Sequence, residues 1–167
     1  IYLSPSTQEG NLYITGGTEE QYMNLVADAM EPILRSSGIQ FQHNTPEMTA
    51  ASSIRQANAG NFDFYLALHS NAAPDALSGQ LRGTDVYYAP NSIWGQRMAN
   101  IIVSNFKVIY PLPNRVRALS TTSIGEVVKT RAPAVLVEIA YHDNVNDAKW
   151  ITGNIQAIAR SLVLSLC

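Results

Sequence analysis

The chain of 167 residues is long enough for one globular domain, and 46% of its residues are hydrophobic. Only 14% are charged and the formal net charge is −2, which argues against binding to nucleic acids or anionic membranes, because both require a concentrated basic surface. No apolar stretch approaches the roughly 18 residues of a membrane span, and the single cysteine, Cys167, excludes an internal disulfide.

Hydrophobic periodicity predicts strands that alternate with helices along the chain. We expect strands at 1–5, 39–42, 62–72, 84–89 and 134–140 with a short one near Val116, and helices at 19–37, 47–58, 92–109 and 151–166 with a partial one at 124–128. Thr18 and Thr45 are the expected N-caps of the first two helices. The alternation indicates an α/β fold, a single domain over 1–167 with a mostly parallel sheet flanked by helices on both faces. Because a strand-like stretch begins at Ile1, we expect the chain to be cut from a longer product.

Two continuous apolar runs each carry an ionisable residue near the carboxyl end. His69 follows the run 64–68, and Glu138 lies in the run 134–140. A lone histidine at a strand end is most often a hydrogen-bonded structural residue, but a buried carboxylate is costly unless it is paired or bound to a metal. Ligands bind at the carboxyl ends of strands in open α/β sheets. The two residues together therefore favour a metal-dependent hydrolase.

Other residues add weaker signals for the same chemistry. Glu19 and Glu20 begin the first helix, where they offer a further ligand, although acidic residues also favour that position through the helix dipole. His142 follows Glu138 by four residues, and Asp143 is placed to orient its ring, although a solvent-exposed turn histidine is the alternative. The chain has no G-x-S-x-G, P-loop, G-x-G-x-x-G or H-E-x-x-H motif, so other chemistries fit less well.

These residues and their spacing resemble the zinc-dependent N-acetylmuramoyl-L-alanine amidases, a family of bacterial cell-wall hydrolases, spore-lytic enzymes and phage endolysins. The resemblance covers almost the whole chain and rests on four matches in order. They are Glu20 before the pair Asn24-Leu25, the pair Ala57-Asn58 before the H-x-N-A motif at 69–72, the G-x-x-V-Y-Y stretch at 83–88, and P-A-V-L-V-E at 133–138 ahead of Asn144.

The resemblance implies a twisted sheet flanked by helices and one zinc ion. It also implies hydrolysis of the amide between N-acetylmuramic acid and L-alanine in peptidoglycan. By this resemblance His69 and Glu20 would be zinc ligands and Glu138 the general base. We also expect Asn71 and Gln8 to contact the substrate. We expect a monomer that acts outside the cell or in the cell wall, with no nucleic-acid or membrane partner.

The chain departs from the family at the first zinc ligand, a histidine in a D-x-G-H-G-G loop. The corresponding loop, 4–8, reads Ser-Pro-Ser-Thr-Gln. His142 is the attractive substitute ligand, while Thr7 or Gln8 could instead hold a water or the substrate and leave His142 as a hydrogen-bonded loop residue. Two other functions stay open: a zinc peptidase that acts on stem peptides, and a non-catalytic cell-wall-binding domain, which the missing histidine favours.

Overall fold

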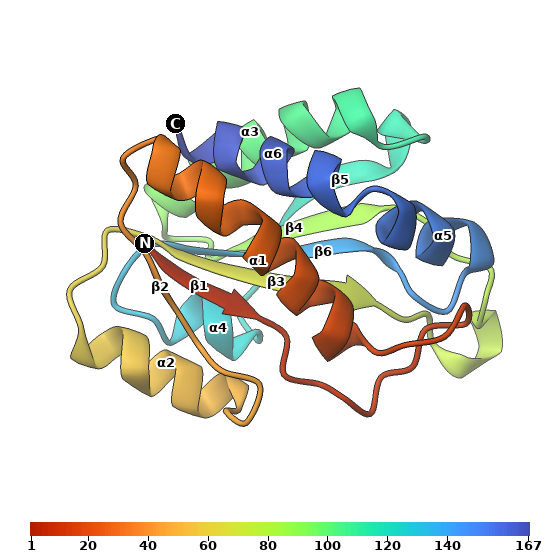
Figure 1. Ribbon diagram of the computed structural model, residues 1–167, viewed down its shortest axis with the longest axis horizontal. Coiled ribbons are helices and arrows are strands. Elements are labelled where there is room, and N and C mark those ends of the chain that lie inside the picture. Colours follow the sequence, from red (N-terminus) through yellow and green to blue (C-terminus); the bar gives the residue numbers. More distant parts are fainter.

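The computed structural model of the chain, which describes all residues from 1 to 167, is built on one six-stranded sheet (Figure 1). The strands lie in the order β2-β1-β3-β6-β4-β5. Their bounds are β1 Tyr2–Pro5, β2 Gln42–His43, β3 Tyr65–Asn71, β4 Thr84–Tyr88, β5 Val116–Ser120 and β6 Ala134–Tyr141. All neighbours pair in parallel except β4 and β6. The predicted α/β fold with a mostly parallel sheet is confirmed.

Helices cover both faces of the sheet, as the sequence predicts (Figure 1). One face packs against α1 (Glu19–Ser36), α3 (Ile93–Ile109) and α6 (Ile155–Leu166). The other carries the shorter helices α2 (Ala50–Ala59) and α4 (Gly125–Val128). The helix α5 (Val145–Gly153) follows β6. Two single 3₁₀ turns, 75–77 and 113–115, lie in the connections.

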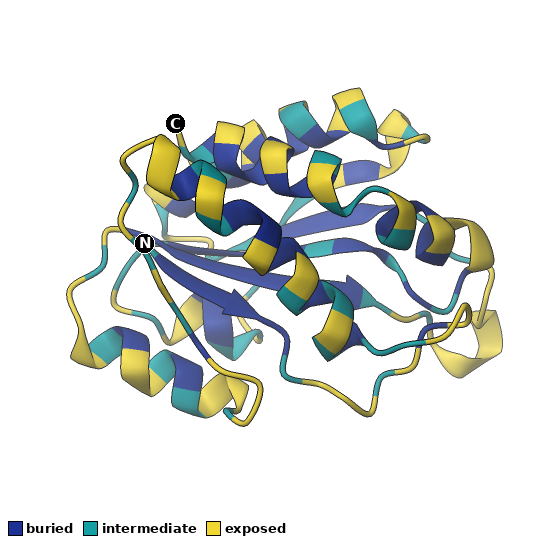
Figure 2. Cartoon of the chain, viewed as in Figure 1, coloured by how far each residue is buried: buried dark blue, intermediate teal, exposed yellow.

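The two faces of the sheet differ in how apolar their cores are. The core under α1, α3 and α6 contains 29 buried hydrophobic residues, whereas the one under α2 and α4 contains seven. Because apolar burial is the main source of stability, the first core accounts for most of it. In Figure 2 the strands β1, β3 and β6 are buried over most of their length, while the helices expose their outer sides. The core under α2 and α4 is therefore the less apolar one, and buried polar side chains lie beside it.

Two predicted helices have different bounds in the structure. The second begins at Ala50 rather than near 47, because Thr49 and not Thr45 caps it: the Ser52 amide donates to Thr49 Oγ1 at 3.1 Å, and the Thr49 amide donates to Ser52 Oγ at 2.8 Å. The last predicted helix, 151–166, is in fact two helices, α5 and α6. Asn144 caps α5 by accepting from the amides of residues 146 and 147, and the chain breaks at Asn154.

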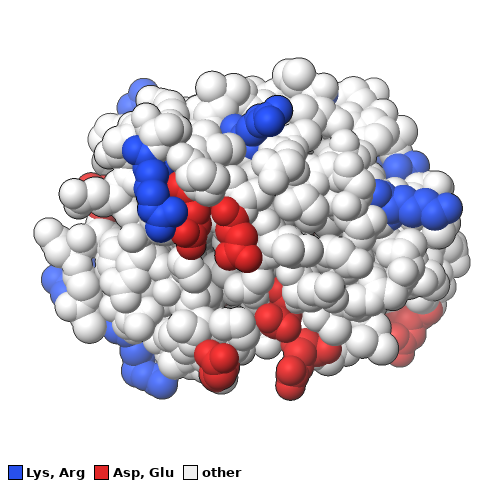
Figure 3. Space-filling view, in the orientation of Figure 1, with Lys and Arg blue, Asp and Glu red and all other residues white.

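Charged side chains are spread thinly over the face of the molecule that carries α1. Figure 3 shows scattered acidic and basic side chains separated by wide uncharged areas on the face that carries α1. None of the helices combines the length and hydrophobicity needed to cross a membrane.

We expect Gly83→Ala to lower the free energy of unfolding by roughly 1–3 kcal/mol, because it introduces backbone strain. Gly83 has φ +134°, and an added Cβ would lie 2.6 Å from the backbone oxygen of Arg115. Its amide also donates to Asp147 Oδ2 at 3.0 Å, which fixes the entry to β4. Urea unfolding measures the change. Gly10→Ala is the matched control, since no atom lies within 4 Å of its added Cβ, and equal losses in the two variants would contradict the strain argument.

Candidate functional site

The two ionisable residues singled out in the apolar runs are neighbours on the sheet. His69 of β3 is the register partner of Glu138 of β6, and Glu138 is also opposite Asp85 of β4. Registered partners project from the same face, which here is the face covered by α2 and α4. The site therefore lies at the carboxyl ends of β3 and β6, on the less apolar side of the sheet.

The ring of His69 lies between two buried carboxylates. Its Nδ1 is 2.9 Å from Glu19 Oε1, and its Nε2 is 2.7 Å from Glu126 Oε2. Glu19 and Glu126 are only 1% and 4% exposed. Burial alone lowers the pKa of His69, but the hydrogen bonds to Glu126 and Glu19 outweigh burial and raise that pKa to about 10. His69 is therefore an imidazolium at neutral pH, bonded to a carboxylate on each side.

Glu126 accepts three hydrogen bonds from side chains that surround it. Besides His69, Ser4 Oγ donates to its Oε1 at 2.6 Å and the Tyr65 hydroxyl donates to the same oxygen at 2.5 Å. Burial raises the pKa of Glu126, but the bonds from His69, Ser4 and Tyr65 outweigh it, so the pKa lies below the ordinary value. The sequence analysis did not identify Glu126. A signal was present, since this acidic residue sits between Ile124 and Val127 in an otherwise apolar segment.

Of the two glutamates at the start of α1, the structure brings Glu19 to His69. Its Oε1 also lies 3.3 Å from the amide of Ser70, and its Oε2 accepts from Asn11 Nδ2 at 2.6 Å. Glu20, which the family resemblance implies as a ligand, is half-buried and its carboxylate makes no hydrogen bond to the chain. Successive residues of a helix point about 100° apart, so only one of the two faces the ring.

The carboxylate of Glu138 has no hydrogen-bond partner within the chain. Its Oε2 is fully enclosed and unpaired, which is rare for a buried polar atom. Burial raises the pKa of Glu138 to about 7; the charge of His69 opposes this shift, and the carboxylates of Glu19 and Asp85 add to it. A carboxylate near half ionisation at neutral pH is suited to accept and return a proton.

His142 takes part in a different contact. Its Nδ1 is 2.9 Å from Ser70 Oγ, and its ring stacks on Tyr13 with centroids 5.3 Å apart. Burial lowers the pKa of His142, so the ring is neutral at pH 7. Tyr13 belongs to the core under α1, α3 and α6, whereas the His69 ring contacts Glu126 of α4 on the other face of the sheet. His142 therefore packs on the side of β3 away from His69.

A polar cavity of about 330 Å³ opens beside His69 and Glu126. The loop after β1 lines it with Ser6, Thr7 and Gln8, and the segment before α2 adds Asn44 and Thr49. Gln8, an expected substrate contact, therefore reaches the site. Asn71, the other expected contact, is not among the lining residues, and its Oδ1 accepts from the amide of Ala72 at 2.9 Å.

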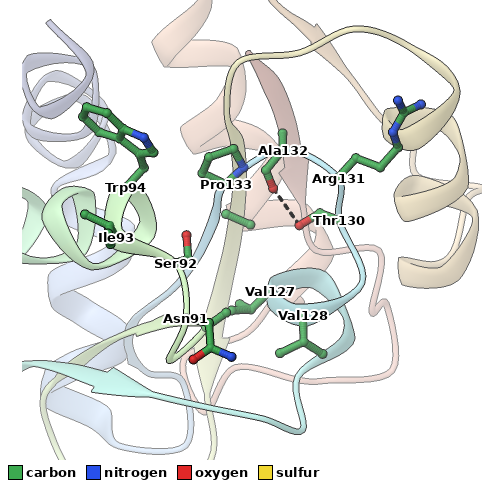
Figure 4. Close-up of a pocket in the computed structure, with 12 residues that line it drawn as sticks. Asn91, Ser92, Ile93, Trp94, Val127, Val128, Thr130, Arg131, Ala132 and Pro133 are labelled. Carbon is green, nitrogen blue, oxygen red and sulfur yellow. Dashed lines mark hydrogen bonds between the residues drawn. The ribbon is translucent and has the colours of Figure 1, made fainter.

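A second, more open cavity of about 550 Å³ lies where β6 begins and β4 ends, at the other end of β6 from Glu138 (Figure 4). Ile93 and Trp94 at the start of α3 form one wall, and Val127 and Val128 of α4 form another (Figure 4). Arg131 is its only charged lining residue. Because it contains no pair of titratable groups, the smaller cavity beside His69 is the better candidate for chemistry.

The residues near His69 supply part of a zinc site. Glu19 and His69 Nδ1 are adjacent, and Glu126 contacts Nε2 in the way that carboxylates orient zinc-bound histidines. Catalytic zinc generally needs three protein ligands. The loop 4–8 contributes only hydroxyls and an amide, and no three histidine, cysteine, aspartate or glutamate side chains of the chain are placed to hold one metal ion. The donor set does not fit the zinc that the resemblance implies.

Comparisons with a family model and with solved structures point to the same family. A family model described as N-acetylmuramoyl-L-alanine amidase matches residues 5–166. A search of curated proteins finds no match. Among the solved structures that the chain resembles, three amidases serve as examples. They are the catalytic domain of CwlV from Bacillus (Paenibacillus) polymyxa var. colistinus (TM-score 0.83, 16% identity, 99% of this chain and 94% of that one), AmiC2 of Nostoc punctiforme (0.79, 18%, 99% and 95%) and an amidase from Clostridium difficile 630 (0.82, 18%, 99% and 92%). At these identities the likeness shows a shared fold.

Proposed function

We propose that this chain, which belongs to the N-acetylmuramoyl-L-alanine amidase family by the match over residues 5–166, hydrolyses the amide between N-acetylmuramic acid and L-alanine in peptidoglycan. The observation that supports catalysis is the unpaired carboxylate of Glu138, in register with the charged ring of His69. The substrate is a cell-wall polymer, so the place of action is the cell wall or the space outside the cell, and we expect the chain to act as a monomer.

In this proposal Glu138 moves the proton of the reaction. Its carboxylate accepts a proton from a water molecule while the water oxygen bonds to the amide carbon. The same carboxyl group then returns the proton to the leaving nitrogen of L-alanine as the carbon–nitrogen bond breaks. Both steps need a group whose pKa is near the working pH, and burial raises the pKa of Glu138 to about 7.

The imidazolium of His69 supplies positive charge beside this carboxylate. Both of its N–H groups are engaged by Glu19 and Glu126, so the ring acts through its charge and not as a donor to the substrate. That charge favours the ionised form of Glu138, which is the form that accepts the proton from water. Thr7 and Gln8 line the adjoining cavity and are our candidates for holding the muramyl peptide.

Zinc would supply a polarised water and a second positive charge, and the sequence led us to expect Glu20, His69 and His142 as its ligands. Of these, only His69 lies at the carboxylate cluster, together with Glu19. The donor set is therefore one ligand short of the three that a catalytic zinc site has.

A second candidate function is a cell-wall-binding domain without activity. The missing third ligand is the observation that favours it, since a family member that lost catalysis would keep the fold and the polar cavity.

The test is turnover of purified peptidoglycan by the whole chain. The proposed function predicts release of peptides whose new amino terminus is L-alanine, together with loss of this release in Glu138→Gln. Release of other amino termini would indicate a peptidase. Sedimentation of the chain with peptidoglycan without any release would indicate the binding domain.

A further inference from the structure

We infer that His69, Glu19 and Glu126 form a metal-independent centre, in which the two carboxylates hold the histidine ring. This His69 centre takes the place of the zinc site that the family resemblance implies. The inference rests on the proposed function only for the location of the site. It concerns what holds the site together, and it can be tested without measuring catalysis.

The first step of the argument is that the buried carboxylates already have partners. A buried ionised group is strongly destabilising unless it is paired. Glu19 and Glu126 are paired through the single ring of His69, at 2.9 and 2.7 Å, and each also accepts hydrogen bonds from neutral donors: Asn11 donates to Glu19, and Ser4 and Tyr65 donate to Glu126. The imidazolium therefore offsets one of the two negative charges, and the hydrogen bonds from neutral donors stabilise both carboxylates without a metal ion.

The second step concerns Nδ1 of His69, the ring nitrogen that a metal would need. Zinc binds an unprotonated imidazole nitrogen, and Nδ1 is in hydrogen-bond contact with Glu19. A metal between them would have to displace the proton of that contact and would gain two protein ligands. Two ligands hold zinc poorly compared with the three of a catalytic site.

The third step is that nothing nearby supplies the third ligand. The cavity beside His69 is lined by Ser6, Thr7 and Gln8, whose hydroxyl and amide groups are poor zinc ligands. His142 is engaged with Ser70 and Tyr13 on the other side of β3. Asp85, opposite Glu138, accepts from Arg117, and the enclosed Oε2 of Glu138 has no hydrogen-bond partner in the chain.

The experiment measures zinc binding to the untagged whole chain by isothermal titration and by elemental analysis. We expect substoichiometric zinc after dialysis, and the same weak affinity in the wild type and in His69→Gln. Circular dichroism verifies that the variant is folded. Stoichiometric zinc that is lost in His69→Gln would overturn the inference.

A variant that adds a histidine beside His69 tests whether the missing third ligand is the reason for weak zinc binding. Thr7 and Gln8 face the same cavity as His69, so the better of Thr7→His and Gln8→His should bind zinc at least ~10-fold more tightly than the wild type. Thr7→Ala is the matched control for loss of the hydroxyl. If neither histidine variant binds more tightly, the missing ligand is not the cause and the inference fails.

Hydrolysis by the same metal-free sample separates this inference from the proposed function. Weak zinc binding without hydrolysis would leave the inference standing and contradict the amidase activity. Tight, His69-dependent zinc binding would refute the inference, whatever the activity.

Discussion

Substitution of Glu138 by glutamine is expected to lower peptidoglycan turnover by roughly 10²- to 10⁴-fold, the usual effect of losing a general base. Glutamine has nearly the same shape but cannot accept the proton of the attacking water. Because neither oxygen of Glu138 has a partner within the chain, the amide breaks no hydrogen bond of the fold. We therefore expect the variant to fold and to bind peptidoglycan like the wild type. Asp28→Asn, on the exposed side of α1, is the matched control.

The pH dependence of the wild type provides an independent readout. The pKa of Glu138 is raised to about 7, and its ionised form is the one that accepts the proton. The ratio kcat/KM should rise as pH increases through about 7, and the residual rate of Glu138→Gln should lack this step. Near-normal turnover in the variant, or a wild-type profile without the step, would assign Glu138 to structure only.

Most of the fold could be predicted because it follows from periodicity. Strands alternating with amphipathic helices leave few arrangements other than an α/β sheet with helices on both faces. Periodicity does not encode strand direction, and the sequence analysis did not foresee that β4 runs antiparallel to β6. The connection from β3 to β4 contains only a 3₁₀ turn, whereas a parallel return needs a longer crossover.

The candidate site could be predicted where an ionisable residue interrupts an apolar run. His69 and Glu138 stand out in this way, and the structure places them in register. Glu126 did not stand out, because α4 is only four residues long and shows no usable period.

The choice between Glu19 and Glu20 could have been made from the sequence. The buried side of α1 includes Met23, Val26 and Met30, and Glu19 precedes Met23 by four residues and Val26 by seven. Those spacings place Glu19 on the buried face. The family motif instead indicated Glu20. The spacing taken from the family and the geometry of the helix therefore pointed to different glutamates. In the structure, Glu19 is the glutamate that contacts His69.

Removal of the carboxylate of Glu126 is expected to have the largest effect on stability. Glu126→Leu leaves the donors Ser4, Tyr65 and His69 without their acceptor in a buried place. Breaking a buried ion pair in this way typically costs about 3–5 kcal/mol of unfolding free energy. Glu126→Gln retains an acceptor oxygen but loses the charge, so its loss should be smaller. Urea unfolding of both variants measures the difference.

The pH dependence of that loss distinguishes a charged pair from simple packing. The pKa of His69 is raised from 6.5 to about 10 in the folded chain, so its contribution to stability is fully present below pH 6.5 and is lost as pH rises through about 10. The pKa of Glu126 is lowered from 4.5, so its contribution is present above pH 4.5 and is lost in acid. The free-energy gap between the wild type and Glu126→Gln should therefore be widest near pH 5–6.5 and shrink towards pH 10. A gap that stays constant over this range would mean that Glu126 stabilises the fold by shape and neutral hydrogen bonding, and that His69 is not held as a cation between the two carboxylates.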